Sequence, residues 1–237
     1  MKLPEIKGFI DLSLVDWDGK VTAVLFLPRC NLRCPFCHNA TLVLNPEEMQ
    51  TIPFEEIRLY LIKNKRWLDG VVITGGEPTI HNDLPILCNQ IKELGLKVKL
   101  DTNGTNYDLL QELIAKEQVD YIALDIKAPI TLERYSNAAG VEARKLMPEV
   151  QKTIKLLLER PIDYEFRTTL VPTIHNHEDI TLICNEIIGC EKYFLQNFKN
   201  DVKTLSPRLA NIQSFTREEM QVFLKLARKI VTNTFLR

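Results

Sequence analysis

The sequence lacks a long hydrophobic run and has no excess of charge of either sign. No apolar stretch approaches the roughly 18–20 residues that a transmembrane helix requires, so we expect no membrane segment. Thirty Lys and Arg against 31 Asp and Glu give a formal net charge of −1, whereas binding to nucleic acid phosphates needs a basic surface. Low-complexity tracts and short repeats are also missing. We therefore expect neither nucleic acid nor membrane among the partners.

The first fifteen residues do not have the pattern of a secretion signal either. The first fifteen residues carry four charged side chains, Lys2, Glu5, Lys7 and Asp11, where a signal peptide would have an apolar core. We expect a cytoplasmic location, in which thiols stay reduced. The six cysteines therefore do not indicate three disulfides.

Short β-type runs alternate with longer helical patterns through most of the chain. The six runs lie at residues 21–27, 71–74, 96–100, 121–126, 164–170 and 193–198. Strands that alternate with helices of 10–15 residues predict βα units and a parallel sheet, in either an open doubly wound sheet or an incomplete barrel. We expect a single domain over 1–237, with a core at about 20–200 and a C-terminal helix at about 216–235.

Polar, glycine or cysteine residues follow the predicted strands at one end. They include Arg29-Cys30, Gly75-Gly76-Glu77, Asp101-Thr102, Asp125-Ile126-Lys127 and Arg167. In both candidate folds the chemistry lies at the carboxyl ends of the parallel strands. The sequence therefore predicts one site at this edge.

Three cysteines lie within eight residues after the first of these strands: Cys30, Cys34 and Cys37. Thiolates are soft ligands that suit zinc and iron–sulfur clusters. A structural zinc site needs four ligands, and His38, next to Cys37, would have to wrap awkwardly to serve as the fourth. A three-thiolate 4Fe–4S cluster, with one iron open to a ligand, fits better. A zinc or iron–sulfur binding module without catalysis is kept as an alternative.

The pattern C-x-x-x-C-x-aromatic-C, with Phe36 in the aromatic place, resembles the signature of radical S-adenosylmethionine (SAM) enzymes. The resemblance implies an incomplete (β/α)6 TIM-like barrel, an oxidoreductase, and one 4Fe–4S cluster held by the three cysteines. It also implies that SAM binds the open iron, near Phe36, Cys37 and His38, and is cleaved to a 5′-deoxyadenosyl radical. Activases with further clusters carry a Cys-rich insert that residues 38–73 lack.

Gly75, Gly76 and Glu77 resemble the GGE motif of the same superfamily. Two glycines allow the backbone to approach a ligand closely, and a glutamate can accept hydrogen bonds from an ammonium group such as that of SAM. A plain strand-to-helix turn is the other interpretation. The position of the motif, after the second strand, favours the cofactor role.

Two further segments resemble the activases of glycyl-radical enzymes: D-T-N-G at 101–104 and D-x-K at 125–127. The resemblance implies that SAM is bound by residues of these segments, namely Asp101, Thr102, Asp125, Ile126 and Lys127. Arg167 on the fifth strand is another candidate partner for the SAM carboxylate, with a surface ion pair as the alternative. SAM carries an ammonium, a sulfonium and a carboxylate, so its pocket needs fixed charges of both signs. The resemblance also allows a monovalent cation among Asp101, Thr102 and Asp125.

The likeness is strongest to the compact activases of anaerobic ribonucleoside-triphosphate reductase, because Asp16-x-x-Gly19 and Leu195-Gln196-x-Phe198 are typical there. It implies a glycyl-radical enzyme as partner, most simply anaerobic ribonucleotide reductase, a reductant such as flavodoxin or ferredoxin, and contact of Asp16 with the substrate peptide. A surface turn at Asp16 is the alternative. A radical SAM enzyme that acts on a small molecule, like 7-carboxy-7-deazaguanine synthase, is the second functional hypothesis.

Overall fold

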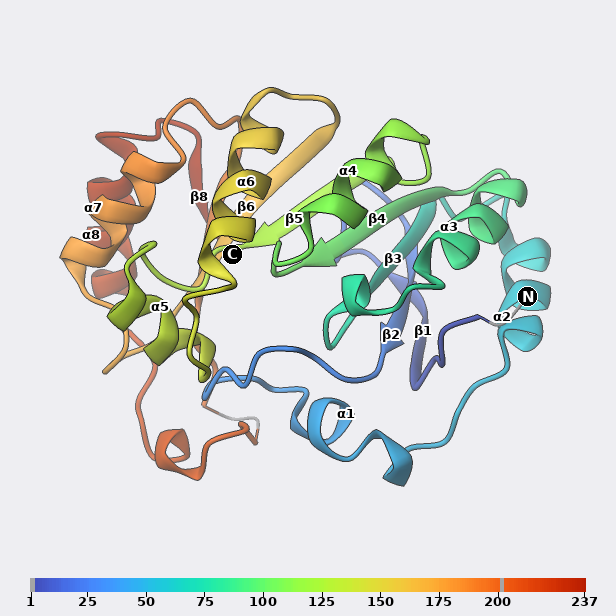
Figure 1. Cartoon of the computed structure of the whole chain (residues 1–237), viewed down its shortest axis with the longest axis horizontal. Helices are drawn as coiled ribbons and strands as arrows, with labels where there is room; N and C mark the ends of the chain where they lie inside the picture. Colours follow the sequence, from blue (N-terminus) through green and yellow to red (C-terminus); the bar gives the residue numbers. More distant parts are fainter. Residues whose placement is uncertain (1–2, 201–202) are drawn as a thin grey trace. The chain divides into compact units, whose positions relative to one another are not determined.

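The computed structural model describes residues 3–200 and 203–237 (Figure 1). The chain forms two compact units. Of the described residues, unit 1 contains 3–31, 41–102 and 108–122, and unit 2 contains 32–40, 103–107, 123–200 and 203–237. A single domain over 1–237 stays a prediction. No helix within the described ranges is both long and apolar enough to span a membrane.

Unit 1 contains four strands that lie in chain order, and the first two residues of a fifth. The strands are β1 (Gly8–Ser13), β2 (Thr22–Leu27), β3 (Gly70–Gly75) and β4 (Lys97–Thr102). β1 is antiparallel to β2, and β2, β3 and β4 are parallel. Apolar residues fill β2 and β3 almost without alternation and nearly all are buried, as is typical of parallel strands that are covered on both faces.

The helices of unit 1 connect these strands. They are α1 (Ala40–Leu44), η1 (Pro46–Glu48), α2 (Phe54–Asn64), η2 (Pro78–Ile80), α3 (Leu84–Glu93) and α4 (Tyr107–Ala115). The first residues of α1 and α4 belong to unit 2. Each long helix turns its apolar side inward; α3, for example, buries Leu84, Leu87, Cys88 and Ile91, at helical spacing. Figure 1 shows α3 beside β4.

Unit 2 continues the alternation from β5 (Tyr121–Asp125), whose last three residues belong to it. The remaining elements are α5 (Leu132–Ala139), α6 (Met147–Leu158), β6 (Asp163–Leu170), α7 (His177–Glu186), β7 (Tyr193–Asn197), η3 (Pro207–Leu209), α8 (Arg217–Arg228) and β8 (Thr234–Leu236). β6, β7 and β8 are parallel neighbours in chain order. α7 and α8 lie beside β8 in Figure 1.

The end of the chain differs from the expected helix at about 216–235. α8 starts with a capping box at Thr216 but ends at Arg228, and Thr234–Leu236 forms β8. The β-branched pair Ile230-Val231 follows the helix, and β8 pairs with β7 from Tyr193↔Thr234 to Leu195↔Leu236. Backbone pairing with a strand already in place outweighs the helical pattern of these last residues.

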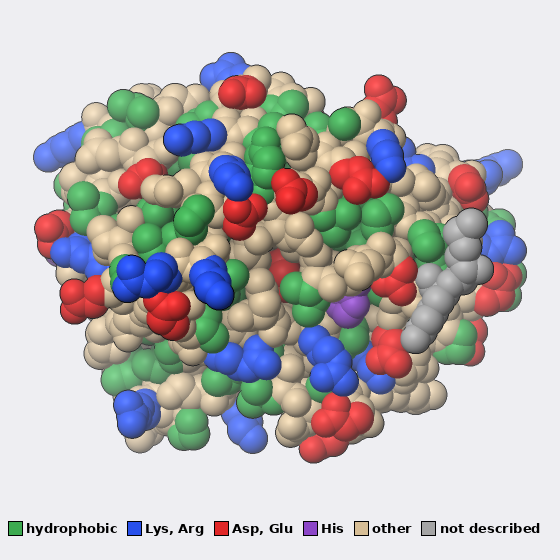
Figure 2. Space-filling model, in the orientation of Figure 1, with side chains coloured by type: hydrophobic (Ala, Val, Ile, Leu, Met, Phe, Trp, Pro, Cys, Tyr) green, Lys and Arg blue, Asp and Glu red, His purple; other side chains and the backbone are tan. Residues whose placement is uncertain are grey.

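Charged side chains of both signs are interspersed over the face of the molecule that Figure 2 draws. This pattern agrees with the formal net charge of −1.

Candidate functional site

The expected site residues fall into two groups, one in each unit. In unit 1, the GGE segment begins at the last residue of β3 and has a conformation that requires glycine. Gly75 has φ +115°, and a Cβ at Gly76 would lie 1.7 Å from the carbonyl oxygen of Arg29. The Glu77 N–H donates to that same oxygen at 2.9 Å. Close backbone approach between this turn and the residue before Cys30 explains the two glycines.

Glu77 ties the ends of two strands together. Its side chain is 1 % exposed, and Oε1 accepts from the Thr79 amide (3.1 Å), the Thr79 hydroxyl (2.6 Å) and the Thr102 hydroxyl (2.7 Å). The structure therefore brings together two expected site residues, Glu77 and Thr102. A buried carboxylate with several donors is held in one orientation.

Lys99 joins two further expected residues of unit 1, Asp16 and Asp101. Its side chain is fully buried, its ammonium donates to the Asp16 carbonyl oxygen at 2.6 Å, and it lies 3.9 Å from Oδ1 of Asp101. The Asp16 carboxylate bonds the Ser13 hydroxyl. Sequence reasoning missed Lys99, although the signal was there: a lysine two residues before Asp101 on a strand shares its face.

The cysteine segment crosses from unit 1, which holds Cys30, into unit 2, which holds Cys34 and Cys37. In unit 2 the segment forms a turn closed by the Cys37 N–H donating to the Cys34 carbonyl oxygen at 3.0 Å. The carbonyls of Pro35 and Cys37 accept from the amides of Ser206 and Leu205, both at 2.9 Å. These backbone bonds fix the loop through the carbonyl oxygens of Cys34, Pro35 and Cys37 and do not involve the thiols.

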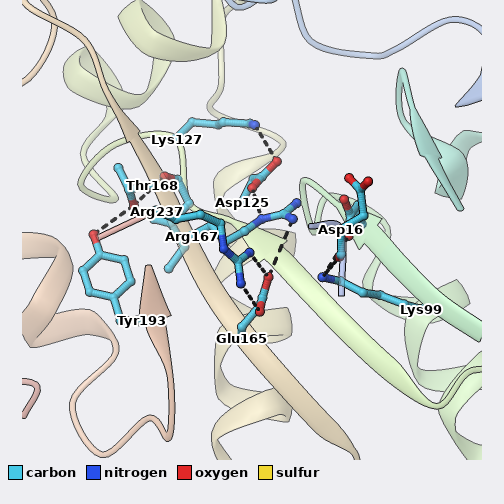
Figure 3. A network of polar contacts seen from close by, with 11 residues as sticks. Asp16, Lys99, Asp125, Lys127, Glu165, Arg167, Thr168, Tyr193 and Arg237 are labelled. Atoms are coloured by element: carbon cyan, nitrogen blue, oxygen red, sulfur yellow. Dashed lines mark hydrogen bonds and ion pairs between the residues drawn. The ribbon is translucent and has the colours of Figure 1, made fainter. Parts of the chain in front are cut away.

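Asp125, Lys127 and Arg167 form one ion-pair group in unit 2 (Figure 3). Arg167 Nε donates to Asp125 Oδ1 at 2.8 Å, and Lys127 Nζ donates to Oδ2 at 3.2 Å. Burial raises the pKa of Asp125, but the charges of Arg167 and Lys127 outweigh it and hold that pKa at about 2. Ile126 is buried beside them, with its N–H donating to the Arg167 carbonyl oxygen at 2.8 Å.

The Lys127 ammonium also affects the pKa values of the Cys34 and Cys37 thiols. Burial raises the pKa of Cys34 to about 11, and Lys127 opposes this shift; the Cys37 pKa is likewise raised by burial and lowered by Lys127 and Arg33. A cation beside a thiol favours the thiolate, which is the form that binds metals. The sequence placed Lys127 near SAM, and unit 2 places it near two of the expected cluster ligands.

A second carboxylate extends the ion-pair group. Glu165 on β6 is 1 % exposed and lies 3.7 Å from Arg167 Nη1 and 3.0 Å from Arg237 Nη1. Arg237 also stacks over the Phe194 ring at 3.9 Å. Glu165 and Arg237 were not among the expected site residues, because the alternation of a strand does not show which polar side chain meets another far along the chain.

His175 links the loop after β6 to Lys127. The Val171 N–H donates to Nδ1 at 3.0 Å, so the neutral ring carries its proton on Nε2 and donates it to the Lys127 carbonyl oxygen at 2.8 Å. The Phe36 ring lies edge-on to His175 at 6.4 Å. His38 is placed differently, with Nε2 3.0 Å from the Lys199 carbonyl oxygen and its ring 6.1 Å from Phe198.

The donor set suits an iron–sulfur cluster. None of the six cysteines is in a disulfide. Three of them follow one strand end, and the charge of the Lys127 ammonium favours the thiolate form of two, Cys34 and Cys37. In the ranges that the structure describes, no three His, Cys, Asp or Glu side chains are placed to share a single metal ion. The cysteines of a 4Fe–4S cluster each bind a different iron.

Comparison with known proteins places the chain in a family. The model of the radical SAM superfamily matches residues 24–183. The chain therefore belongs to the radical SAM superfamily, whose members use a 4Fe–4S cluster and SAM.

Two relatives match nearly the whole chain. A protein of Methanocaldococcus jannaschii, with the provisional name glycyl-radical enzyme activating enzyme, is 31 % identical over 98 % of this chain and 95 % of its own length. The pyruvate formate-lyase-activating enzyme of Clostridium pasteurianum is 25 % identical over 98 % of this chain and 100 % of its own. Within the superfamily, the likeness is to the glycyl-radical enzyme activating enzymes, and the expected oxidoreductase class is confirmed.

The fold agrees with a solved structure. SuiB of Streptococcus suis bound to S-adenosylmethionine has a TM-score of 0.68 and 18 % identity, over 90 % of this chain and 51 % of that one. This chain thus spans about half of SuiB, and at this identity the likeness concerns the fold alone. It confirms the expected fold class, an α/β fold with a parallel sheet and an incomplete barrel.

Proposed function

We propose that this chain activates anaerobic ribonucleoside-triphosphate reductase, by generating a glycyl radical on it. When bound, the reduced cluster supplies the electron that cleaves SAM into methionine and a 5′-deoxyadenosyl radical, which takes a hydrogen atom from a glycine Cα. Flavodoxin or ferredoxin would reduce the cluster, in the cytoplasm. The likeness over the whole chain to named activating enzymes supports the activase class.

The observation that carries the proposal is the ion-pair group beside the cysteine turn. The positive charge of Lys127 opposes the rise in pKa that burial causes at Cys34 and Cys37, and its ammonium also donates a hydrogen bond to Asp125. SAM, which would bind the open iron of the cluster, carries both an ammonium and a carboxylate. Its binding site therefore needs fixed charges of both signs near the cluster. Cys30, Cys34 and Cys37 hold the cluster in this proposal.

The remaining roles follow from the motifs. Lys127 and Arg167 bind the SAM carboxylate, Asp125 binds the ribose side of SAM, and Glu77 and Gly76 bind its ammonium through carboxylate and backbone groups. Phe36 and His38 line the cluster loop. Asp16 contacts the glycine loop of the partner, and the Lys99 bond to its carbonyl oxygen supports this role by fixing the turn.

The test mixes reconstituted, photoreduced protein with SAM and anaerobic ribonucleotide reductase under anaerobic conditions. We expect a persistent glycine-centred doublet in the electron paramagnetic resonance spectrum, and one 5′-deoxyadenosine per radical. A reductase with its radical glycine replaced by alanine is the control and should give no doublet. Deoxyadenosine without a partner radical, stimulated instead by a small metabolite, would contradict the proposal and favour the small-molecule hypothesis.

A further inference from the structure

We infer that this enzyme needs no monovalent metal cation for SAM binding, because the Lys99 ammonium supplies that positive charge from within the chain. The inference rests on the proposed SAM-binding function. It concerns the place where the resemblance allows a cation, among Asp101, Thr102 and Asp125. In each unit, the side chains that would bind the ion already have other partners.

Lys99 is built into unit 1 as a fixed cation. It is 0 % exposed and lies on β4 two residues before Asp101, so both side chains leave the strand on the same face. Residues two apart on a strand are separated by roughly 6–7 Å, which the four-carbon stem of a lysine can span. The ammonium accordingly reaches to 3.9 Å from Asp101 Oδ1.

Two further contacts hold this ammonium in place. It donates to the Asp16 carbonyl oxygen at 2.6 Å and lies 5.3 Å from the centre of the Tyr121 ring. A carbonyl oxygen, a carboxylate and an aromatic face are the groups that a buried cation requires, since an isolated charge is too costly to bury. A sodium or potassium ion would bind the same oxygens, those of the Asp16 carbonyl and the Asp101 carboxylate.

The other two expected ligands are also engaged. The Thr102 hydroxyl donates to Glu77 Oε1 at 2.7 Å within unit 1. Within unit 2, each oxygen of the Asp125 carboxylate accepts from a cation, Oδ1 from Arg167 and Oδ2 from Lys127. A metal ion added at Asp125 would face the charges of Arg167 and Lys127, and one added at Asp101 would face the Lys99 ammonium, 3.9 Å from Oδ1. Like charges at short range repel strongly in a buried place.

The experiment measures SAM affinity by calorimetry on the cluster-loaded protein, at equal ionic strength in tetramethylammonium, sodium, potassium or rubidium chloride. Tetramethylammonium is too large to enter such a site. We expect the dissociation constant to agree within about twofold across the four salts, the scale of small salt effects on a buried group. Tightening by about tenfold or more in one metal salt would overturn the inference.

The variant Lys99→Met removes the ammonium and keeps the stem. We expect weaker SAM binding in tetramethylammonium and recovery of at least about fivefold in sodium or potassium, because a metal ion can then take the vacated place. Lys97→Met, an exposed lysine on the same strand, is the matched control and should stay insensitive to the salt. A Lys99→Met protein that binds SAM equally in all salts would contradict the inference.

A second readout does not depend on SAM. An ion that binds only the folded state raises the melting temperature, so the wild-type protein should melt at the same temperature in all four salts. Lys99→Met, or Lys99→Gln if the first variant does not fold, should be stabilised selectively by sodium or potassium. Failure to bind SAM in any salt would refute the proposed function, whereas the melting data would still decide the cation question.

Discussion

Among single residues, Lys127 has the most consequential neighbours. It bonds Asp125 at 3.2 Å, and its charge opposes the rise in pKa that burial causes at Cys34 and Cys37 in the cysteine turn. One side chain therefore pairs with the Asp125 carboxylate and favours the thiolate form of Cys34 and Cys37.

The Lys127→Met variant should therefore react more slowly at Cys34. Without the ammonium, the pKa of Cys34 rises further above about 11, and the thiolate fraction at pH 8 falls by roughly threefold or more, since one pKa unit is a factor of ten. Iodoacetamide labelling of the cluster-free protein, read by mass spectrometry, measures this rate. Lys145→Met, an exposed lysine of unit 2, is the control; equal rates in both variants would refute the effect.

His175 is the residue from which we expect a pH effect on stability. Burial lowers its pKa from 6.5, against smaller opposing contributions that include its bond to Lys127 and the charge of Asp179. A histidine with a lowered folded-state pKa stabilises the fold fully above the unfolded pKa and loses this contribution as the pH falls below about 6.5.

Urea unfolding at pH 8, 6.5 and 5.5 tests this prediction with His175→Gln. The variant should be less stable by about 1 kcal/mol at pH 8, because one of two hydrogen bonds is lost, and its stability should change less between pH 8 and 5.5 than that of the wild type. His177→Gln, an exposed histidine of the same unit, should keep the wild-type slope. A His175→Gln slope as steep as the wild type would exclude His175 as the titrating group.

At the level of elements, the C-terminus of α5 supports the cysteine segment. The Arg33 N–H donates to the Ala139 carbonyl oxygen at 2.8 Å, and Gly140 caps the helix with φ +67°. A Cβ at Gly140 would lie 1.9 Å from the Arg33 carbonyl oxygen. Close contact between two backbones, one residue before Cys34, explains why this cap has no side chain.

Gly140→Ala should destabilise the protein by roughly 2–3 kcal/mol, from the left-handed backbone together with the clash. Gly189→Ala is the matched control, because Gly189 has φ +86° and open space around its Cβ position, so only about 1 kcal/mol is expected. We also expect Gly140→Ala, but not Gly189→Ala, to bind less iron after reconstitution. Equal losses of stability in thermal or urea unfolding would show that the contact with Arg33 carries no energy.

For the whole molecule, the proposed cluster predicts an effect on global stability. A group that binds the folded chain and not the unfolded one stabilises the fold by mass action. Anaerobic reconstitution should therefore give about four irons and four sulfides per chain, a brown colour, and a higher melting temperature than the cluster-free protein. Chelation of the iron should reverse the gain, whereas Cys88→Ser, which changes a buried thiol of α3, should leave the iron content unchanged. One zinc and no sulfide per chain would replace the cluster proposal with the zinc alternative.

Local pattern determined the repeating βα order, the cysteine loop and the motifs at the strand ends, because period, turn residues and ligand spacing are properties of neighbours in the chain. Only the tertiary structure decided that Lys99 meets Asp101 and the Asp16 carbonyl, that Glu165 joins Arg167 to Arg237, and that the last residues form β8. Those contacts join residues up to 83 positions apart and depend on which strands become neighbours. A sequence pattern specifies the face on which a buried charge lies, whereas packing selects the partner that makes its burial tolerable.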